Sequence, residues 1–149
     1  MIGKKALFSH ESDEWETPQE LFDELNAEFH FDLDACATAE NHKCAEYFAP
    51  EDDGLCKPWG GKKVFCNPPY SSIAKWVEKA YRETRTDNTL VVLLIPSRTD
   101  TRYFHDFIYQ RTEIRFIKGR LRFHSKDKKT GNAPFPSMIV IFRGAKIKE

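Results

Sequence analysis

The sequence lacks long hydrophobic runs, closely spaced cysteine pairs and grouped histidines. No apolar run approaches the roughly 20 residues of a membrane-spanning helix, so we expect no membrane partner. After the first two lysines only Ala6-Leu7-Phe8 is apolar, too short a core for a signal peptide, so we expect a cytoplasmic protein. Because there is no C-x-x-C pair and no pair of histidine ligands, we expect no metal.

The residues that are present have the composition of a globular domain. Of 149 residues, 40% are hydrophobic and 13% aromatic, which suits one domain with a sizeable core. Residues 1–14 are polar and are interpreted as a lead-in, so we place a single domain at 15–149. The sequence leaves the oligomeric state open.

A net charge of zero hides an uneven distribution. Residues 1–60 hold four lysines against fifteen acids, a net charge of −11, and residues 61–149 carry +11. A basic half suits a polyanionic partner, and pairing of the two halves within the fold is the alternative.

Apolar periodicity predicts the elements of the first half. Thr17-Pro18-Gln19-Glu20 is typical of a capping box with proline at the first helical position, and a helix is predicted over 18–29. Residues 30–37 alternate apolar and acidic side chains, which predicts a strand that ends at Asp34. A short strand is possible at 45–48.

The second half alternates strands and helices before a terminal pair of strands. Strands are predicted at 63–66 and 89–96, each followed by a helix, the second of them over 101–109. The last two strands are predicted at 113–123 and 137–142. This order predicts an α/β fold with a mostly parallel sheet, an antiparallel edge strand and helices on the faces.

The stretch VFCNPPYSS places two prolines where one strand ends and the next helix begins. We call Asn67-Pro68-Pro69-Tyr70 the NPPY turn. Ligands of open α/β sheets bind beyond the carboxyl ends of strands, so Asn67 and Asp34 are expected to face one cleft.

The NPPY turn suits an amino group on an aromatic ring, whose lone pair is delocalised. The Asn67 side-chain oxygen can accept one N–H of this group, and the Pro68 carbonyl, held rigid by Pro69, can accept the other. This pair of bonds draws the nitrogen toward tetrahedral geometry and frees its lone pair. Tyr70 can stack on the ring, as aromatic residues do with extruded bases.

A methyl group on a sulfonium is a fitting electrophile, because it needs neither a metal nor a strong base. S-adenosylmethionine supplies such a group. Its amino group suits the acidic strand end at Asp34, and its ribose or adenine suits a further acid such as Asp53.

The order of segments resembles the phage DNA N-6-adenine-methyltransferase (Dam) family, a compact Rossmann-like branch of the S-adenosylmethionine-dependent methyltransferases. The blocks that carry the resemblance are WETPQELFDEL, FDLDACATAEN, DDGLCKPWGG, FCNPPYS, LLIPSRTDTRYFH, RFIKGRLRF and APFPSMIVIF. The resemblance implies methylation of adenine in DNA by the NPPY turn. It also implies Thr17, Pro18, Asp34 and Asn67 as cofactor contacts, and the host cytoplasm if a phage encodes the protein.

The glycine-rich first motif of larger methyltransferases, F-x-G-x-G, is absent, and Asp34-Ala35-Cys36-Ala37 stands in its place. Asp52 and Asp53 are both candidates for the cofactor ribose. Trp59 either borders the cofactor pocket or anchors a loop.

Basic residues gather in the segment 118–130. They suit phosphate contacts beside a duplex, and a solvated hairpin loop is the alternative. Arg98, which follows the apolar strand, is expected at the same cleft. The expected DNA contacts are Arg98, Lys118, Arg120, Arg122, Lys126, Lys128 and Lys129.

The function predicted from these features is transfer of a methyl group from S-adenosylmethionine to the N6 amino group of a flipped adenine in DNA. One alternative is a methyltransferase acting on another planar amine, either the cytosine amino group or a protein glutamine. The other is a DNA-binding relative that has lost the cofactor.

Overall fold

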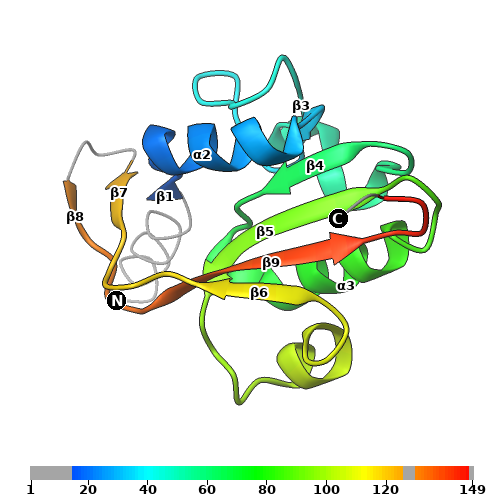
Figure 1. The fold of residues 1–149 in the computed structure, drawn as a ribbon. Helices are drawn as coiled ribbons and strands as arrows, with labels where there is room; N and C mark the ends of the chain where they lie inside the picture. Colours follow the sequence, from blue (N-terminus) through cyan, green and yellow to red (C-terminus); the bar gives the residue numbers. More distant parts are fainter. Residues whose placement is uncertain (1–14, 126–129, 148–149) are drawn as a thin grey trace, which may run out of the picture.

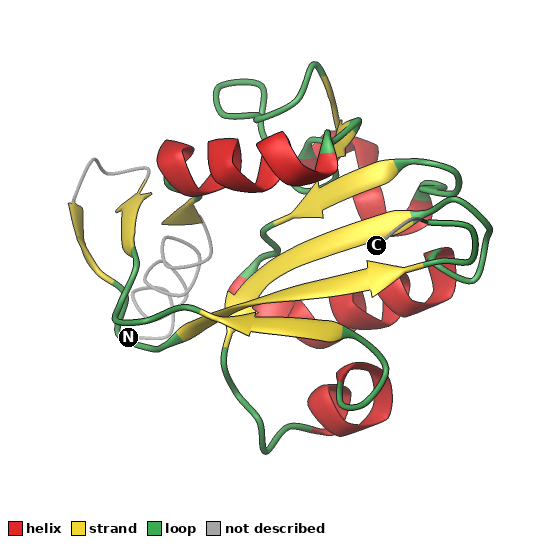
Figure 2. Ribbon diagram, in the orientation of Figure 1, coloured by secondary structure: helices red, strands yellow, loops and turns green. Residues whose placement is uncertain are grey.

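A six-stranded, mostly parallel β-sheet with helices on both faces forms the body of the molecule (Figures 1 and 2). The computed structural model describes residues 15–125 and 130–147, with the backbone alone for 123–125 and 130–132. The expected lead-in and three of the expected DNA contacts, Lys126, Lys128 and Lys129, lie outside the described residues. The architecture confirms the predicted α/β fold class.

The strand order in this sheet is β3-β2-β4-β5-β9-β6. Strand β9 runs against both of its neighbours, and the other strands run parallel to one another. The antiparallel strand is therefore one position in from the edge, where the last two strands form an antiparallel pair. The bounds are β2 (Leu33–Asp34), β3 (Glu46–Tyr47), β4 (Lys63–Cys66), β5 (Leu90–Pro96), β6 (Glu113–Phe116) and β9 (Ser137–Arg143).

Two central strands hold the sheet together. β5 pairs with β9 along its whole length, from Leu90 opposite Arg143 to Pro96 opposite Ser137. Every residue of β5 is buried, as its continuous apolar sequence predicts for a strand covered on both faces. Its side chains alternate between two hydrophobic cores, one on each side of the sheet.

Helices cover these two cores. α2 (Gln19–Phe29) packs through Phe22, Leu25 and Phe29 on one face. α3 (Ile73–Glu83) packs through a stripe that includes Trp76 and Val77 on the other face, together with the π-helix η4 (Phe104–Ile108). The prediction that Trp76 is a core residue is confirmed.

A second, smaller sheet lies beyond the carboxyl ends of the parallel strands (Figure 1). Its order is β1-β7-β8, with β1 (Trp15–Glu16), β7 (Arg122–Ser125) and β8 (Thr130–Asn132). β1 pairs antiparallel with β7, which places Trp15 opposite Ser125. The chain therefore brings its first described residues beside β7, which belongs to the basic segment 118–130.

The expected capping box at residues 17–20 is wrong. α2 begins at Gln19, and Pro18 is non-helical with φ −56° and ψ 131°. No side chain caps this helix, because the Thr17 hydroxyl instead accepts a hydrogen bond from Asn67. This tertiary contact outweighs the local one that the sequence pattern suggests.

Three other predicted elements have different bounds. The strand expected to begin at residue 30 and end at Asp34 does end there, but it is limited to β2, since His30 ends the preceding helix in the left-handed region with φ 55°. The strand expected at 113–123 is broken into β6 and β7 around Gly119, whose φ is +76°. The helix expected at 101–109 is the π-helix η4 with a short lead-in.

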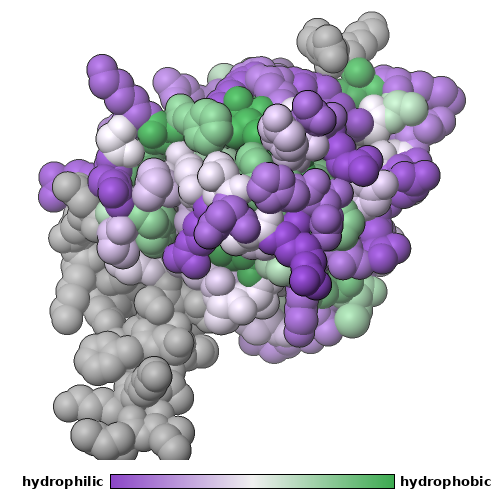
Figure 3. All heavy atoms as spheres, turned by 90° about the horizontal axis from the view of Figure 1, so that it is seen from below, coloured by the Kyte–Doolittle hydropathy of each residue, from purple (hydrophilic) through white to green (hydrophobic). Residues whose placement is uncertain are grey.

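The face seen from below Figure 1 is largely hydrophilic, with hydrophobic side chains in a few small areas (Figure 3). Among the described residues, the large hydrophobic side chains with high exposure are Tyr109 at 50% and Phe116 at 64%. Most large hydrophobic side chains of the described residues thus pack in or against the two cores.

Candidate active site

The carboxyl ends of the parallel strands meet at one edge of the sheet, facing the small β1-β7-β8 sheet (Figure 1). Asp34 ends β2, and it lies opposite Phe65 of the neighbouring strand β4. The NPPY turn follows β4 directly, so Asp34 and Asn67 lie at the same edge, as predicted.

The side-chain amide of Asn67 is held from one side. Its Nδ2 donates to the Trp15 carbonyl at 2.8 Å and to the Thr17 hydroxyl at 3.0 Å. The Trp15 carbonyl can only accept a hydrogen bond, which fixes the nitrogen on this side and Oδ1 on the other. Oδ1 has no hydrogen-bond partner in the part of the chain that the structure describes.

The two prolines differ in the hydrogen bonding of their carbonyl groups. The Pro69 carbonyl accepts a hydrogen bond from Ser72 N at 3.1 Å, which starts the path into α3. The Pro68 carbonyl has no hydrogen-bond partner among the described residues. Both peptide bonds are trans, and Pro69 is extended with φ −60° and ψ 133°. Two acceptors, Asn67 Oδ1 and Pro68 O, thus stand on adjacent residues.

Tyr70 is half-buried and rests against Phe135, which precedes β9. Their ring centroids are 5.1 Å apart and the rings are nearly perpendicular, at 86°. Burial raises the pKa of Tyr70, and the nearby Arg98 offsets this in part. The phenol is therefore neutral at physiological pH, and its ring orientation is fixed by an edge-to-face contact.

Asp34 is a buried acid, with only 4% of its surface exposed. Burial raises the pKa of its carboxyl group from 3.8 to about 6, although the backbone N–H groups of Lys43 and Cys36 oppose the shift. The Lys43 backbone N–H donates to Oδ2 at 2.9 Å, while the Lys43 ammonium bonds to Gln19. Because no cationic side chain of the described residues pairs with it, Asp34 fits a cationic ligand.

The two further acids differ in their surroundings. Asp52 Oδ2 accepts a hydrogen bond from the Ala49 backbone at 2.9 Å, which caps the 3₁₀ turn η1 (Pro50–Asp52). Asp53 is exposed, and the thiol of Cys56 donates to its Oδ2 at 3.0 Å. Both acids are exposed, and the Asp52 carboxylate has a structural partner in the backbone, whereas that of Asp53 has the Cys56 thiol.

Trp59 anchors the loop that carries these acids. It is fully buried, and its indole N–H donates to the Gly54 carbonyl at 3.0 Å. Gly54 packs so closely on the strand end that an added Cβ would lie 2.5 Å from the Ala35 carbonyl oxygen. Of the two roles considered for Trp59, loop anchor fits the structure, and the loop is pressed against the residue that follows Asp34.

The described basic residues of the expected DNA surface are exposed. Arg98 follows β5 and Lys118 follows β6, and both strands end at the edge that carries Asn67. Arg120 precedes the small sheet at this edge, and Arg122 is the first residue of its strand β7. The structure therefore brings these four cations to the same side of the molecule as the NPPY turn.

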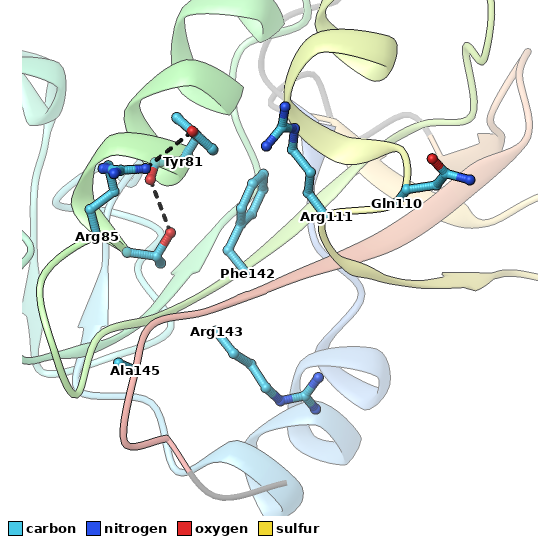
Figure 4. Close-up of a pocket in the computed structure, with 8 residues that line it drawn as sticks. Tyr81, Arg85, Gln110, Arg111, Phe142, Arg143 and Ala145 are labelled. Atoms are coloured by element: carbon cyan, nitrogen blue, oxygen red, sulfur yellow. Dashed lines mark hydrogen bonds between the residues drawn. The ribbon is translucent and has the colours of Figure 1, made fainter.

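A separate cavity of about 520 Å³ lies at the opposite, amino-terminal end of the sheet (Figure 4). Arg85 and Arg111 flank it, each with its guanidinium group over the Tyr81 ring, at 5.7 and 5.8 Å. Phe142 of β9 lies between them (Figure 4). None of the expected catalytic or cofactor residues lines this cavity.

Comparison with known proteins identifies the family. The profile of the DNA N-6-adenine-methyltransferase (Dam) family matches residues 4–148. The chain belongs to the Dam family. A DNA N-6-adenine-methyltransferase of Haemophilus phage HP1 (strain HP1c1) is 30% identical over 147 residues, covering 95% of this chain and 85% of the phage protein. That of Escherichia phage T1 is 34% identical over 111 residues, 73% of this chain and 46% of the phage protein.

Membership of the Dam family confirms the resemblance read from the sequence and makes the chain one of a family of DNA adenine-N6 methyltransferases. In the described ranges 15–125 and 130–147, no helix is long and apolar enough to cross a membrane. The same ranges contain no group of three or more histidine, cysteine or acidic side chains placed to hold a metal ion.

Two groups at this candidate site were missed from the sequence. The Trp15 carbonyl is a backbone group, so no residue type signals its role. The sequence around Phe135 could have indicated its role, because Phe135 stands between two prolines in APFPS, much as the NPPY turn joins prolines to an aromatic residue.

Proposed function

We propose that this Dam-family protein transfers a methyl group from S-adenosylmethionine to the N6 amino group of an adenine flipped out of DNA. The single observation that carries the proposal is the orientation of the Asn67 amide. Its nitrogen is bonded to Trp15 and Thr17, so its oxygen is left as an acceptor beside the Pro68 carbonyl. Two adjacent acceptors match the two N–H bonds of one amino group.

The residues of the NPPY turn act on the base. Asn67 Oδ1 and Pro68 O accept the two N6 hydrogens, which draws the nitrogen lone pair out of conjugation with the ring. Pro69 keeps the preceding carbonyl in place, because its ring fixes φ. Tyr70 offers its ring face for stacking and is braced edge-on by Phe135. The N6 lone pair forms the new bond to the methyl carbon, and N6 then releases one proton to water.

The acidic strand ends hold the methyl donor. S-adenosylmethionine supplies, when bound, a methyl group on a sulfonium whose sulfur keeps the electron pair of the broken S–C bond. The buried Asp34 carboxylate suits the donor's ammonium group, since no cationic side chain of the described residues forms an ion pair with it. Asp53, in the loop packed against Ala35, suits the ribose hydroxyls. Thr17 and Pro18 lie at the same edge, beside Asn67.

Base flipping follows from the position of the target atom. N6 of adenine is hydrogen-bonded to thymine inside a duplex, and both of its hydrogens must be free to reach Asn67 and Pro68. The exposed cations Arg98, Lys118, Arg120 and Arg122 suit the phosphates on either side of the extruded nucleotide.

The test is to identify the methylated base. The purified protein is incubated with unmethylated DNA and S-adenosylmethionine that carries tritium in its methyl group, and the DNA is digested to nucleosides. We expect the label in N6-methyldeoxyadenosine. Label in a cytosine nucleoside alone, or in no nucleoside, would contradict the proposal.

A further inference from the structure

The strongest unassigned feature of the site is the contact between Thr17 and Asn67. Thr17 is 4% exposed, and its hydroxyl lies 3.0 Å from Asn67 Nδ2. The family resemblance implies a contact of Thr17 with the cofactor. In the structure its hydroxyl oxygen accepts a hydrogen bond from the amide that the proposed reaction uses.

Resting on the function proposed above, we propose that Thr17 is a positioning residue, which together with the Trp15 carbonyl locks the Asn67 amide with its oxygen toward the substrate. The Trp15 carbonyl and the Thr17 hydroxyl accept the two hydrogens of the Asn67 NH₂ group, at 2.8 and 3.0 Å. Rotation of the amide by 180° would place Oδ1 against the Trp15 carbonyl, where two lone pairs would repel each other. The lock therefore acts on orientation as well as position.

The lock also gives a reason for asparagine rather than aspartate at position 67. A carboxylate offers two acceptor oxygens and no donor, so one of them would face the Trp15 carbonyl. An amide donates a hydrogen bond to the Trp15 carbonyl through its nitrogen and still presents its oxygen as an acceptor on the other side. In this chain the residue type at position 67 is set by its partners in the segment 15–17.

The segment that carries the lock is itself held by the small sheet. β1 pairs with β7, with Trp15 opposite Ser125 and Glu16 opposite His124. On its other side Thr17 leads through Pro18 into α2, and the Phe22 N–H donates to the Pro18 carbonyl at 3.1 Å. Thr17 is thus held between β1 and α2, which allows its hydroxyl to hold the Asn67 side chain of the NPPY turn in place.

The proposal is tested with a matched pair of substitutions. Thr17→Val keeps the shape of the side chain and removes the hydroxyl, whereas Thr17→Ser keeps the hydroxyl. For Thr17→Val we expect kcat of methyl transfer to adenine to fall about 10- to 100-fold, because one part-buried N–H of the Asn67 amide loses its partner and the amide is less well oriented. We expect the Kd for S-adenosylmethionine, measured by calorimetry, to change less than about twofold. Thr17→Ser should restore kcat to within about threefold of the wild type.

Two results would overturn the proposal. If Thr17→Val raises the cofactor Kd and leaves kcat nearly unchanged, the hydroxyl binds the cofactor directly. If Thr17→Val and Thr17→Ser reduce kcat equally, the hydroxyl has no role. Thr17→Ala is the second variant if Thr17→Val does not fold, and it should show the same loss of kcat.

A measurement without turnover separates this proposal from the proposed function. The side-chain NH₂ signal of Asn67, assigned by its absence from an Asn67→Ala sample, should exchange with solvent faster in Thr17→Val than in the wild type. Equal exchange rates would overturn the lock. A wild type that transfers no methyl group to adenine would contradict the function, and the exchange rates would still decide the role of Thr17.

Discussion

At the residue scale, Asp34 carries the largest electrostatic cost in the site. Burial disfavours its charged form and holds its pKa at about 6, well above 3.8, so an ionised Asp34 destabilises the fold at neutral pH. Groups that lower stability in this way often belong to functional sites. A bound ammonium group would restore the favourable surroundings that the protein alone does not provide.

Cofactor affinity should therefore depend on pH. Below pH 6 Asp34 is protonated and must lose its proton to pair with the cofactor's ammonium group, so affinity should rise with pH up to about 6 and level off above it. Calorimetry with S-adenosylmethionine between pH 5 and 8 measures this. A flat profile, or affinity that falls as the pH rises to 7, would contradict the role of Asp34.

Asp34→Asn is the control for this prediction. Asparagine keeps an acceptor for the Lys43 backbone N–H and loses the titration. We expect weaker binding with no rise between pH 5 and 6. Any pH dependence that persists in Asp34→Asn belongs to another group and not to Asp34.

At the element scale, the loop that carries Asp53 depends on a close backbone approach. A Cβ at Gly54 would lie 2.5 Å from the Ala35 carbonyl oxygen and 3.2 Å from the Trp76 ring. Gly54→Ala should therefore push the loop away from the Asp34 strand end. We expect a cofactor Kd raised about tenfold and a loss of about 1–3 kcal/mol in the free energy of unfolding, measured by calorimetry and denaturant titration.

Gly60→Ala is the matched control, because its Cβ would meet only the Thr86 side chain, at 3.2 Å. We expect its cofactor affinity to equal that of the wild type. If Gly54→Ala and Gly60→Ala have the same affinity, the packing of residue 54 on Ala35 does not position the site.

Periodicity and strand composition predicted the large elements well, since α2, α3, β4 and β5 follow their apolar patterns. The errors occur where long-range partners decide local structure. The hydroxyl of Thr17 bonds Asn67, fifty residues away, so the expected helix cap is absent. The strand expected at 113–123 divides at Gly119, because β7 pairs with β1 from the other end of the chain. No local pattern encodes such pairings.

At the scale of the whole molecule, the two oppositely charged halves pair with each other only sparingly. Among the ion pairs of the described residues, Lys62–Glu46 and Arg115–Glu28 join them, and the others lie within residues 61–149. The basic half therefore keeps cations available for a polyanion. This distribution favours DNA contact over internal neutralisation.

The salt dependence of DNA affinity should locate that contact. Replacing Arg120 and Arg122 together by alanine should reduce the slope of log K against log[salt] by about 2, if each neutralises one phosphate. The matched control replaces Arg85 and Arg111, at the opposite end of the sheet, by alanine, and should leave the slope unchanged (Figure 4). Fluorescence anisotropy with a labelled duplex at several salt concentrations measures both. Equal slopes for the two double variants would contradict the proposed surface.

The central claim is that the Asn67 amide oxygen and the Pro68 carbonyl activate N6 of adenine, and single-turnover methyl transfer by Asn67→Ala tests it most directly. We expect the rate to fall by a factor on the order of 10²–10³, the cost of removing one preorganised polar group from a reacting centre. Calorimetry on the same variant should give a cofactor Kd within about threefold of the wild type. Single-turnover transfer to adenine at the wild-type rate in Asn67→Ala would contradict the account.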